Sequence, residues 1–250
     1  MDTDKKHPQS PANASIAKSE TTQSTCRRCG TCCEKGGPGF HQEDRMLIEK
    51  GRIPLKYLYT IRKGEFAYDN VNGRLMPVDS DIIKIKEKED TWTCIFFDEQ
   101  NRGCSIYNDR PLECRTLKCW DTVELEKMYA KHRLTRDDLI SEVEGLWDLI
   151  NDHQARCDYE KIINLINDFD GPRKDRARKK LMEIIQYDAE FRKLVVEKGG
   201  LDAAMLDFLF GRPLRETLPA YGIKVRQEGR KTIISRTPQS DGRRQRTEDR

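Results

Sequence analysis

The chain has 250 residues, of which 36% are hydrophobic and 36% are charged, and its formal net charge is only +3. The small net charge argues against a nucleic-acid partner, and the modest hydrophobic share argues against one thick core. No apolar stretch approaches the ~18 residues that a membrane span needs, so no membrane association is expected.

The first 25 residues are polar, rich in Ser, Thr and Lys, and lack the apolar run of a secretory signal. The sequence therefore predicts a disordered N-terminal tail over residues 1–25 and a cytoplasmic protein. Nine cysteines follow. In a reducing compartment, clustered cysteines are more often metal ligands or redox groups than disulfides. An odd number of cysteines would also leave one thiol unpaired if all the others formed disulfides. We therefore interpret the cysteines as metal ligands.

Four of the nine cysteines lie in the array CRRCGTCC, from Cys26 to Cys33. Thiolates are soft ligands suited to zinc and to iron–sulfur clusters. The repeated Cys-x2-Cys step lets Cys26, Cys29 and Cys32 converge on one ion. The adjacent side chains of Cys32 and Cys33 tend to diverge, so Cys33 faces a second ion or cluster, or is not a ligand. Two four-sulfur sites, or one cluster plus one zinc, fit the spacing equally well.

Short elements are predicted between the array and the next cysteine. Met46 to Ile48 lie in a short helix that reaches about Lys50, and Pro54 to about Arg62 form a second short helix. A strand is predicted over Ile82–Ile85, with hairpin turns at Asn72-Gly73 and at Asn101-Arg102-Gly103.

The second set of cysteines lies where strand gives way to helix. The segment from Cys94 to Phe97 is predicted to run out along a strand, and a hairpin would bring Cys94 and Cys104 towards each other. The helix that follows has Pro111 in its first turn and carries Cys114. Cys119 comes five residues later, about 140° round an ideal helix. It can therefore share an ion with Cys114 only if the helix ends between them, and otherwise the two serve different ions.

From Asp121 onward the sequence predicts an almost entirely helical region. Thr135 and Asp138 form a capping box, and the helix that they begin has an apolar face running from Leu139 to Ile150. The remaining predicted elements are a helix around Ile162–Ile166, a long helix between Gly171-Pro172 and Gly199-Gly200, short helices over 201–210 and 213–219, a hairpin over Val225–Ile234 centred on Glu228-Gly229, and a disordered tail over 237–250.

Two further features each have a structural and a functional interpretation. The run from Arg173 to Lys180 holds six basic residues, and the first turns of a solvated helix are a better interpretation than a nucleic-acid patch. His153 and Cys157 are four residues apart on a predicted helix, the spacing at which two ligands can share an ion. A lone cysteine on such a helix is more often a small buried hydrophobe, so the structural interpretation is favoured here too.

Charge offers a consistency check on a thiolate site. Zinc held by four thiolates is dianionic, and a buried anion needs partners. Basic side chains next to the ligands would offset this charge and donate hydrogen bonds to sulfur, unless they are ordinary surface charges. The flanking basic residues are Arg27, Arg28, Lys35, Arg110, Arg115 and Lys118.

The chain resembles the CxxCxxCC family of zinc- or iron-chelating cysteine-cluster proteins. The resemblance rests on CRRCGTCC, followed by a Gly/Pro turn and a short helix, and then on CIFFDEQNRGCSIYNDRPLECR. It covers about residues 26–119, with the two motifs in the family's order. Tyr107, Arg110 and Pro111 match the family's I-Y-x-x-R-P step. The resemblance implies the metal ligands Cys26, Cys29, Cys32, Cys33, Cys94, Cys104 and Cys114, with Cys119 as the eighth.

The expected fold is α+β and mostly helical. Residues 26–120 would form a metal-stapled cysteine domain with a β-hairpin, and residues 121–236 a helical region ending in a short hairpin. The expected function is that of a cytosolic metal-binding protein with zinc or an iron–sulfur cluster as cofactor.

Two other functions stay open. Some relatives are associated with flagellin lysine N-methylation, so the resemblance also allows a redox or lysine N-methylase-like enzyme using an iron–sulfur site. The chain has no glycine-rich loop typical of an S-adenosylmethionine pocket, and a sulfur-saturated site is usually structural or electron-carrying. The third hypothesis is an interaction module, in which metal only staples the core and the charged helices meet a protein partner. The sequence does not decide whether the protein is an enzyme.

Overall fold

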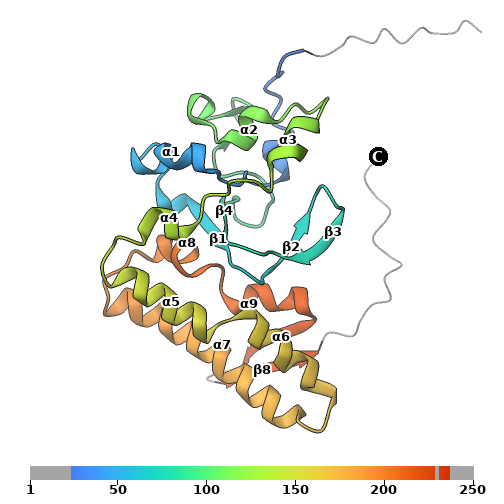
Figure 1. Ribbon diagram of the computed structural model, residues 1–250, viewed down its shortest axis with the longest axis vertical. Coiled ribbons are helices and arrows are strands. Elements are labelled where there is room, and N and C mark those ends of the chain that lie inside the picture. Colours follow the sequence, from blue (N-terminus) through green and yellow to red (C-terminus); the bar gives the residue numbers. More distant parts are fainter. Residues whose placement is uncertain (1–23, 229–230, 237–250) are drawn as a thin grey trace, which may run out of the picture.

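The computed structural model describes residues 24–228 and 231–236, which are coloured in Figure 1. Nearly all of the expected tail over 1–25, the whole of the expected tail over 237–250, and Gly229 of the expected hairpin turn lie outside these ranges. The described chain is α+β and mostly helical, as the sequence predicts. Its strands form four separate antiparallel pairs.

Across the described ranges, no helix combines the length and the apolar character needed to cross a membrane.

The N-terminal half is built from short elements, shown in the upper part of Figure 1. Two predicted hairpins are confirmed. Asn72-Gly73 lies between β2 and β3, with Gly73 at φ +63°, and residues 101–102 lie between β5 and β6, which begins at Gly103. The elements of this half are α1 (Arg45–Glu49), β1 (Leu58–Ile61), β2 (Phe66–Asp69), β3 (Arg74–Pro77), β4 (Ile82–Ile85), β5 (Phe97–Asp98), β6 (Gly103–Cys104), α2 (Leu112–Thr116) and α3 (Val123–Met128).

The helix predicted from Pro54 to about Arg62 is wrong. Leu55–Tyr57 make one turn of 3-10 helix, and the chain then enters β1, which pairs with β4 so that Leu58 lies opposite Ile85. All four residues of β1 are buried. A strand that is buried on both faces shows no apolar–polar alternation, so its periodicity cannot be distinguished from that of a short buried helix.

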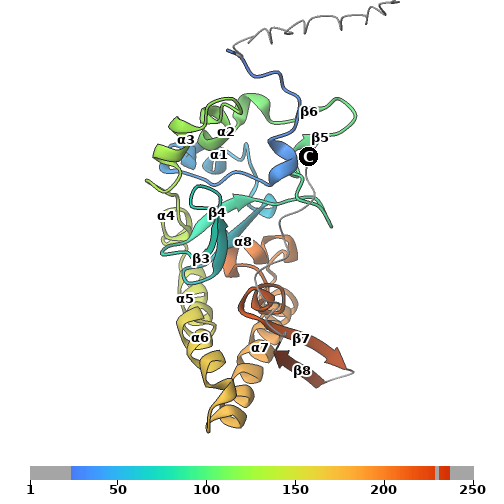
Figure 2. The same ribbon diagram turned by 90° about the vertical axis from the view of Figure 1, so that its right-hand side faces the viewer.

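The C-terminal half contains the longer helices, and in Figure 2 its terminal hairpin lies beside α7. The capping box is confirmed, because Thr135 Oγ1 accepts from the backbone N of Asp138 and its own backbone N donates to the Asp138 carboxylate. The elements are α4 (Arg136–Ile140), α5 (Leu146–Arg156), α6 (Tyr159–Asn167), α7 (Lys174–Glu197), α8 (Leu206–Phe210), α9 (Leu214–Thr217), β7 (Ile223–Glu228) and β8 (Lys231–Arg236).

The single helix predicted from Thr135 to Ile150 is two helices. The chain leaves α4 after Ile140 and enters α5 at Leu146, and Gly145 between them has φ +74°. A left-handed backbone conformation cannot continue a right-handed helix and is adopted most easily by glycine, so Gly145 keeps α4 and α5 apart. The apolar positions on both sides still face one core, which is why the periodicity continued across the break.

Two clusters of buried side chains hold the fold together. The first joins both halves of the chain, since Phe40 and Ile83 of the N-terminal half belong to it together with Phe191 and Phe208 of the C-terminal half. The second lies within the C-terminal half and includes Leu181. The cysteine-bearing segments therefore sit on a scaffold that reaches into the helical half.

Candidate metal centre

The cysteine array is fixed by a contact that only glycine permits. Gly30 has φ +83°, and a Cβ placed on it would lie 2.3 Å from the ring of Phe97. The backbone then turns, with the N of Cys33 donating to the Gly30 carbonyl at 2.7 Å. The Cys33 carbonyl in turn accepts from the N of Cys94 at 2.7 Å. The array therefore docks on the segment that carries the second set of cysteines.

A stack of charged and aromatic side chains ties the array to the I-Y-x-x-R-P step. The guanidinium of Arg28 lies 3.9 Å from the ring centre of Tyr107, and that of Arg110 lies 3.5 Å from the same ring. Arg102 adds a hydrogen bond of 3.1 Å to the Cys29 carbonyl. Cation–π contacts of this kind are each worth roughly 0.5–2 kcal/mol, so they hold the two motifs against each other.

Five cysteines from both motifs lie within range of one another's charge, although in residues 24–228 and 231–236 no three cysteines have all their sulfur atoms within 4.8 Å of one another. The charge on each acts on its neighbours: Cys33 interacts with the thiols of Cys94 and Cys104, and Cys114 interacts with both of these and with Cys32. Cys94 is buried, Cys33, Cys104 and Cys114 are half-buried, and Cys32 is exposed. We call Cys32, Cys33, Cys94, Cys104 and Cys114 the five-cysteine group.

The thiols of this group differ in acidity. A hydrogen bond from the Cys33 thiol lowers the pKa of Cys32 to about 6, and the positive charge of Arg110 acts in the same direction. The same hydrogen bond, together with burial, raises the pKa of Cys33. Burial raises the pKa of Cys94 to about 11 and also raises the pKa of Cys114. One thiolate is therefore available near neutral pH, while binding a metal would release protons from the others.

The other three predicted ligands do not belong to the five-cysteine group. Cys26, Cys29 and Cys119 are exposed. Cys29 lies 3.3 Å from the Thr31 hydroxyl, a hydrogen bond that lowers the pKa of the Cys29 thiol. α2 ends at Thr116, so the helix does end between Cys114 and Cys119, which is the condition under which these two thiols can share an ion.

The strand predicted from Cys94 to Phe97 is shorter than expected. β5 begins only at Phe97, which pairs with Cys104, while Cys94 forms an isolated bridge with Glu87. The N of Phe97 donates to the Cys94 carbonyl at 2.9 Å, so the chain turns just before the strand. The thiols of Cys94 and Cys104 still come close enough for their charges to interact, as the hairpin prediction required.

Buried polar residues position the helix that carries Cys114. Asp44 is fully buried and accepts from the N of Leu112 at 2.8 Å and from Arg115 at 3.3 Å. Glu113 accepts from the N of Gly39 at 2.6 Å and lies 3.3 Å from His41 Nε2. No sequence pattern indicated a role for Asp44 or Glu113, because their hydrogen-bond partners lie about 70 residues away along the chain. Of the flanking basic residues, Arg110 acts on the thiols, whereas Arg115 pairs with Asp44.

A second set of ligand-type side chains lies in α5, at the residue that caps its C-terminal end, and in α7. The ligand atoms of His153, Cys157 and Asp188 all lie within 4.8 Å of one another, and all three residues are buried. His153 Nε2 is 2.8 Å from Asp188 Oδ1, and Arg192 donates to that same oxygen at 3.0 Å. The other oxygen of Asp188 accepts from the N of Leu214 at 2.9 Å.

This second set is better explained as a structural hub than as a metal site. The Asp188 carboxylate already accepts three hydrogen bonds, and a bound cation would compete with Arg192 for it. A second buried guanidinium, that of Arg62, donates to the Cys157 carbonyl at 3.2 Å. A divalent ion here would add positive charge beside two buried cations, at high electrostatic cost. Burial raises the pKa of Cys157 to about 12, so this thiol behaves as a small hydrophobe.

The structure thus sets a cysteine-rich segment against a helical scaffold. Residues 25–136 match the family model CxxCxxCC, described as "Putative zinc- or iron-chelating domain", which confirms the resemblance seen in the sequence. No curated protein and no solved structure matches the chain. The matched segment contains all eight predicted ligands and ends at the first residue of α4, so His153, Cys157 and Asp188 lie outside it.

Proposed function

We propose that residues 25–136 bind a metal centre, zinc or an iron–sulfur cluster, through cysteine thiolates. The observation that carries the proposal is the five-cysteine group itself. Its members come from four segments of chain: the array, the bridge at Cys94, β6 and α2. Packing alone does not require four separate segments to bring five thiols within range of one another's charge, whereas a shared metal centre would.

The chemistry of the donor set fits such a centre. Thiolates suit zinc and iron, and Arg110 beside Cys32 and Cys104 offsets part of their negative charge. The five-cysteine group would supply the inner ligands, with Cys26, Cys29 and Cys119 on adjoining segments completing the set. Zinc would supply cross-linking, and an iron–sulfur cluster would add one-electron transfer. Thiolate ligation of this kind is best maintained in a reducing compartment, so we place the protein in the cytoplasm.

Elemental analysis of protein purified without oxygen tests the proposal. Brown protein that absorbs near 400 nm and contains iron and sulfide identifies a cluster, whereas colourless protein with stoichiometric zinc identifies a zinc site. A folded protein with no metal and nine titratable thiols would overturn the proposal.

A pair of matched variants tests the ligand assignment. Cys104→Ser removes a member of the five-cysteine group and should abolish metal binding. Cys157→Ser makes the same chemical change at a buried cysteine outside the group and should leave the metal content unchanged. Equal metal content in both variants would remove Cys104 from the ligand set.

A further inference from the structure

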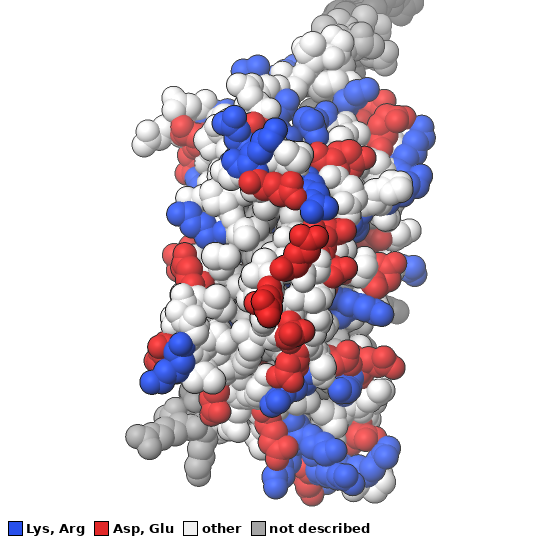
Figure 3. Space-filling model, turned by 60° about the vertical axis from the view of Figure 1, so that its left-hand side comes forward, with Lys and Arg blue, Asp and Glu red and all other residues white. Residues whose placement is uncertain are grey.

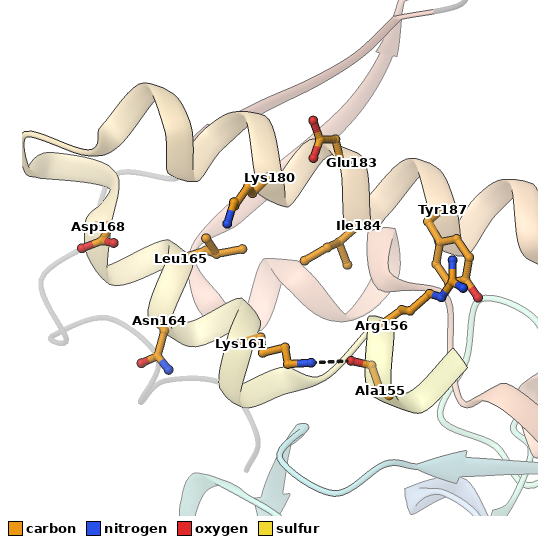
Figure 4. A pocket seen from close by; sticks show the side chains of 10 residues that line it. All are labelled: Ala155, Arg156, Lys161, Asn164, Leu165, Asp168, Lys180, Glu183, Ile184 and Tyr187. Atoms are coloured by element: carbon orange, nitrogen blue, oxygen red, sulfur yellow. Dashed lines mark hydrogen bonds between the residues drawn. The ribbon is translucent and has the colours of Figure 1, made fainter. Parts of the chain in front are cut away.

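The helical half carries a long groove that the metal centre does not use. It runs between α6 and α7 and encloses about 750 Å³. Figure 4 shows Leu165 of α6 and Ile184 of α7 facing each other across it, with Tyr187 at one end. These three side chains are only half-buried. We define the α6–α7 groove by Arg156, Lys161, Leu165, Lys180, Ile184 and Tyr187.

A smaller hollow of about 230 Å³ continues the groove towards the start of α7. It shares Leu165 and Lys180 with the main groove and adds Arg173 and Arg176. Together the two hollows follow α7 from Arg173 to Tyr187, a length of about 21 Å at 1.5 Å per residue. This length corresponds to about four turns of a docked helix.

Positive charge gathers at one end of this path. Figure 3 shows Lys and Arg side chains clustered at the lower end of the molecule, where α7 begins. All six basic residues from 173 to 180 are exposed. Arg173 pairs with Asp168 at 2.9 Å, whereas Arg176 and Lys180 have no ion-pair partner within residues 24–228 and 231–236. Two cations at the edge of an apolar floor are therefore available to a ligand.

The opposite end is held by contacts within the chain. Arg156 lies over the ring of Tyr187 at 4.9 Å and pairs with Asp152 at 3.2 Å. Lys161 donates to the Ala155 carbonyl at 2.8 Å, the contact drawn in Figure 4. The groove is thus apolar along its floor, bounded by contacts within the chain at the Tyr187 end and electropositive at the Arg176 end.

We propose that the α6–α7 groove binds an acidic amphipathic helix of a partner protein. The apolar stripe of such a helix would cover Leu165 and Ile184, and its acidic side chains would pair with Arg176 and Lys180. Insertion of an amphipathic helix into an apolar groove is a recurrent mode of peptide recognition. The charge complementarity would speed the encounter and set the orientation of the helix.

The groove fits a nucleic acid less well. Its floor is apolar, and the carboxylates of Asp168 and Glu183 line it. A helix can place its carboxylates only where Arg176 and Lys180 lie, whereas the evenly spaced phosphates of a backbone that followed the groove would also meet Glu183. The groove also lies outside the matched residues 25–136, so this proposal does not depend on the proposed metal centre.

Two synthetic peptides of 16 residues test the proposal with the full-length protein by fluorescence anisotropy. Both present the same leucine stripe, and their remaining positions are mainly Glu in the acidic probe and Lys in the basic probe. We expect the acidic probe to bind about tenfold or more tightly than the basic probe at low salt. The double variant Arg176→Glu/Lys180→Glu should reverse this preference.

The matched control is Lys193→Glu/Lys198→Glu, which makes the same charge change at exposed positions near the other end of α7. It should leave the preference for the acidic probe intact. Any of three results would overturn the proposal: neither probe binds, both bind equally, or the groove variant behaves like the control. Displacement of the acidic probe by a single-stranded oligonucleotide would also overturn it, in favour of a nucleic-acid surface. Metal content, measured on the same samples, reports separately on the metal centre.

Discussion

The two halves of this chain hold their shape in different ways. In residues 25–136 the longest helix, α3, has six residues and no strand exceeds four, whereas α7 in the second half has 24. Helices shorter than about 12–15 residues are marginal on their own in water. The first half therefore depends on contacts between distant segments and, by our proposal, on metal. The second half depends on helix packing.

The difference is one of degree, because the first buried cluster spans both halves. Phe40 and Ile83 pack in it with Phe191 and Phe208. The cysteine-rich half thus packs firmly on the helical half through this cluster, while the segments that carry its thiols consist of short elements and loops. Perturbing each half separately should show how far the two can be uncoupled.

Removing the metal should give the largest effect. Thiolate metal sites contribute on the order of 10 kcal/mol to the folding of small domains. After chelation, hydrogen exchange followed by mass spectrometry should show loss of protection in residues 26–35 and 94–119, with α7 still protected. Equal loss of protection in α7 would show that the helical half is not independently stable.

A cavity in the second cluster should give the next largest effect. Leu181 in α7 is fully buried, so Leu181→Ala should cost about 2–5 kcal/mol and lower the melting temperature by roughly 10 °C. Calorimetry measures this change, and metal content should stay the same. Leu194→Ala on the same helix is the control, because Leu194 is 55% exposed and should cost under about 1 kcal/mol.

Acid should weaken the helical half through Asp188. Burial opposes ionisation of this carboxyl, but the hydrogen bond from His153 and the charge of Arg192 outweigh it and lower the pKa to about 2. Because the folded-state pKa lies below the unfolded value of 3.8, the contribution is fully present above about pH 4 and is lost as the pH falls towards 2. Its size is about 2–3 kcal/mol.

Thermal melts of the helical signal from pH 7 to pH 2 measure this effect. Asp188→Asn should be less stable than the wild type at pH 7 and should lose less stability between pH 4 and pH 2. Parallel pH profiles for the two proteins would show that Asp188 is not the group responsible. Burial also lowers the pKa of His153, so protonation of the unfolded chain weakens the wild type further below about pH 6.5.

The helix cap at the boundary between the halves should give the smallest effect. Thr135→Ala removes the side-chain acceptor for the N of Asp138 and should cost about 1 kcal/mol, measured by urea unfolding. Thr135→Ser keeps the hydroxyl and should cost little. A large loss in both variants would mean that the methyl group of Thr135, not its hydroxyl, matters here.

Much of the fold could be predicted where the signal is local. The hairpin turn at Asn72-Gly73 and the capping box at Thr135 depend on residues within a few positions of each other. The strand β1 could not be recognised, because its identity depends on pairing with β4, more than 20 residues away. The break at Gly145 was hidden because the apolar pattern on either side stays in phase.

The candidate site shows the same limit. Cysteine spacing identified the residues that could bind metal, but not which segments dock together. The docking depends on the Gly30–Phe97 contact and on Tyr107 lying between two guanidinium groups. The residues that position α2, the helix that carries Cys114, could not be predicted for a similar reason. Asp44 lies 68 residues from its hydrogen-bond partner Leu112 in the sequence.

The Asp188 hub also bears on the order in which the helices assemble. Its carboxylate accepts from His153 of α5, Arg192 of α7 and the backbone of Leu214 at the start of α9. The Arg192 bond lies within α7, but the bonds from His153 and Leu214 can form only after these helices have met, so we expect them to form late in folding. Asp188→Asn should therefore accelerate unfolding in stopped-flow experiments while leaving the refolding rate nearly unchanged. Asp188 would then control the unfolding rate, and with it the lifetime of the native state.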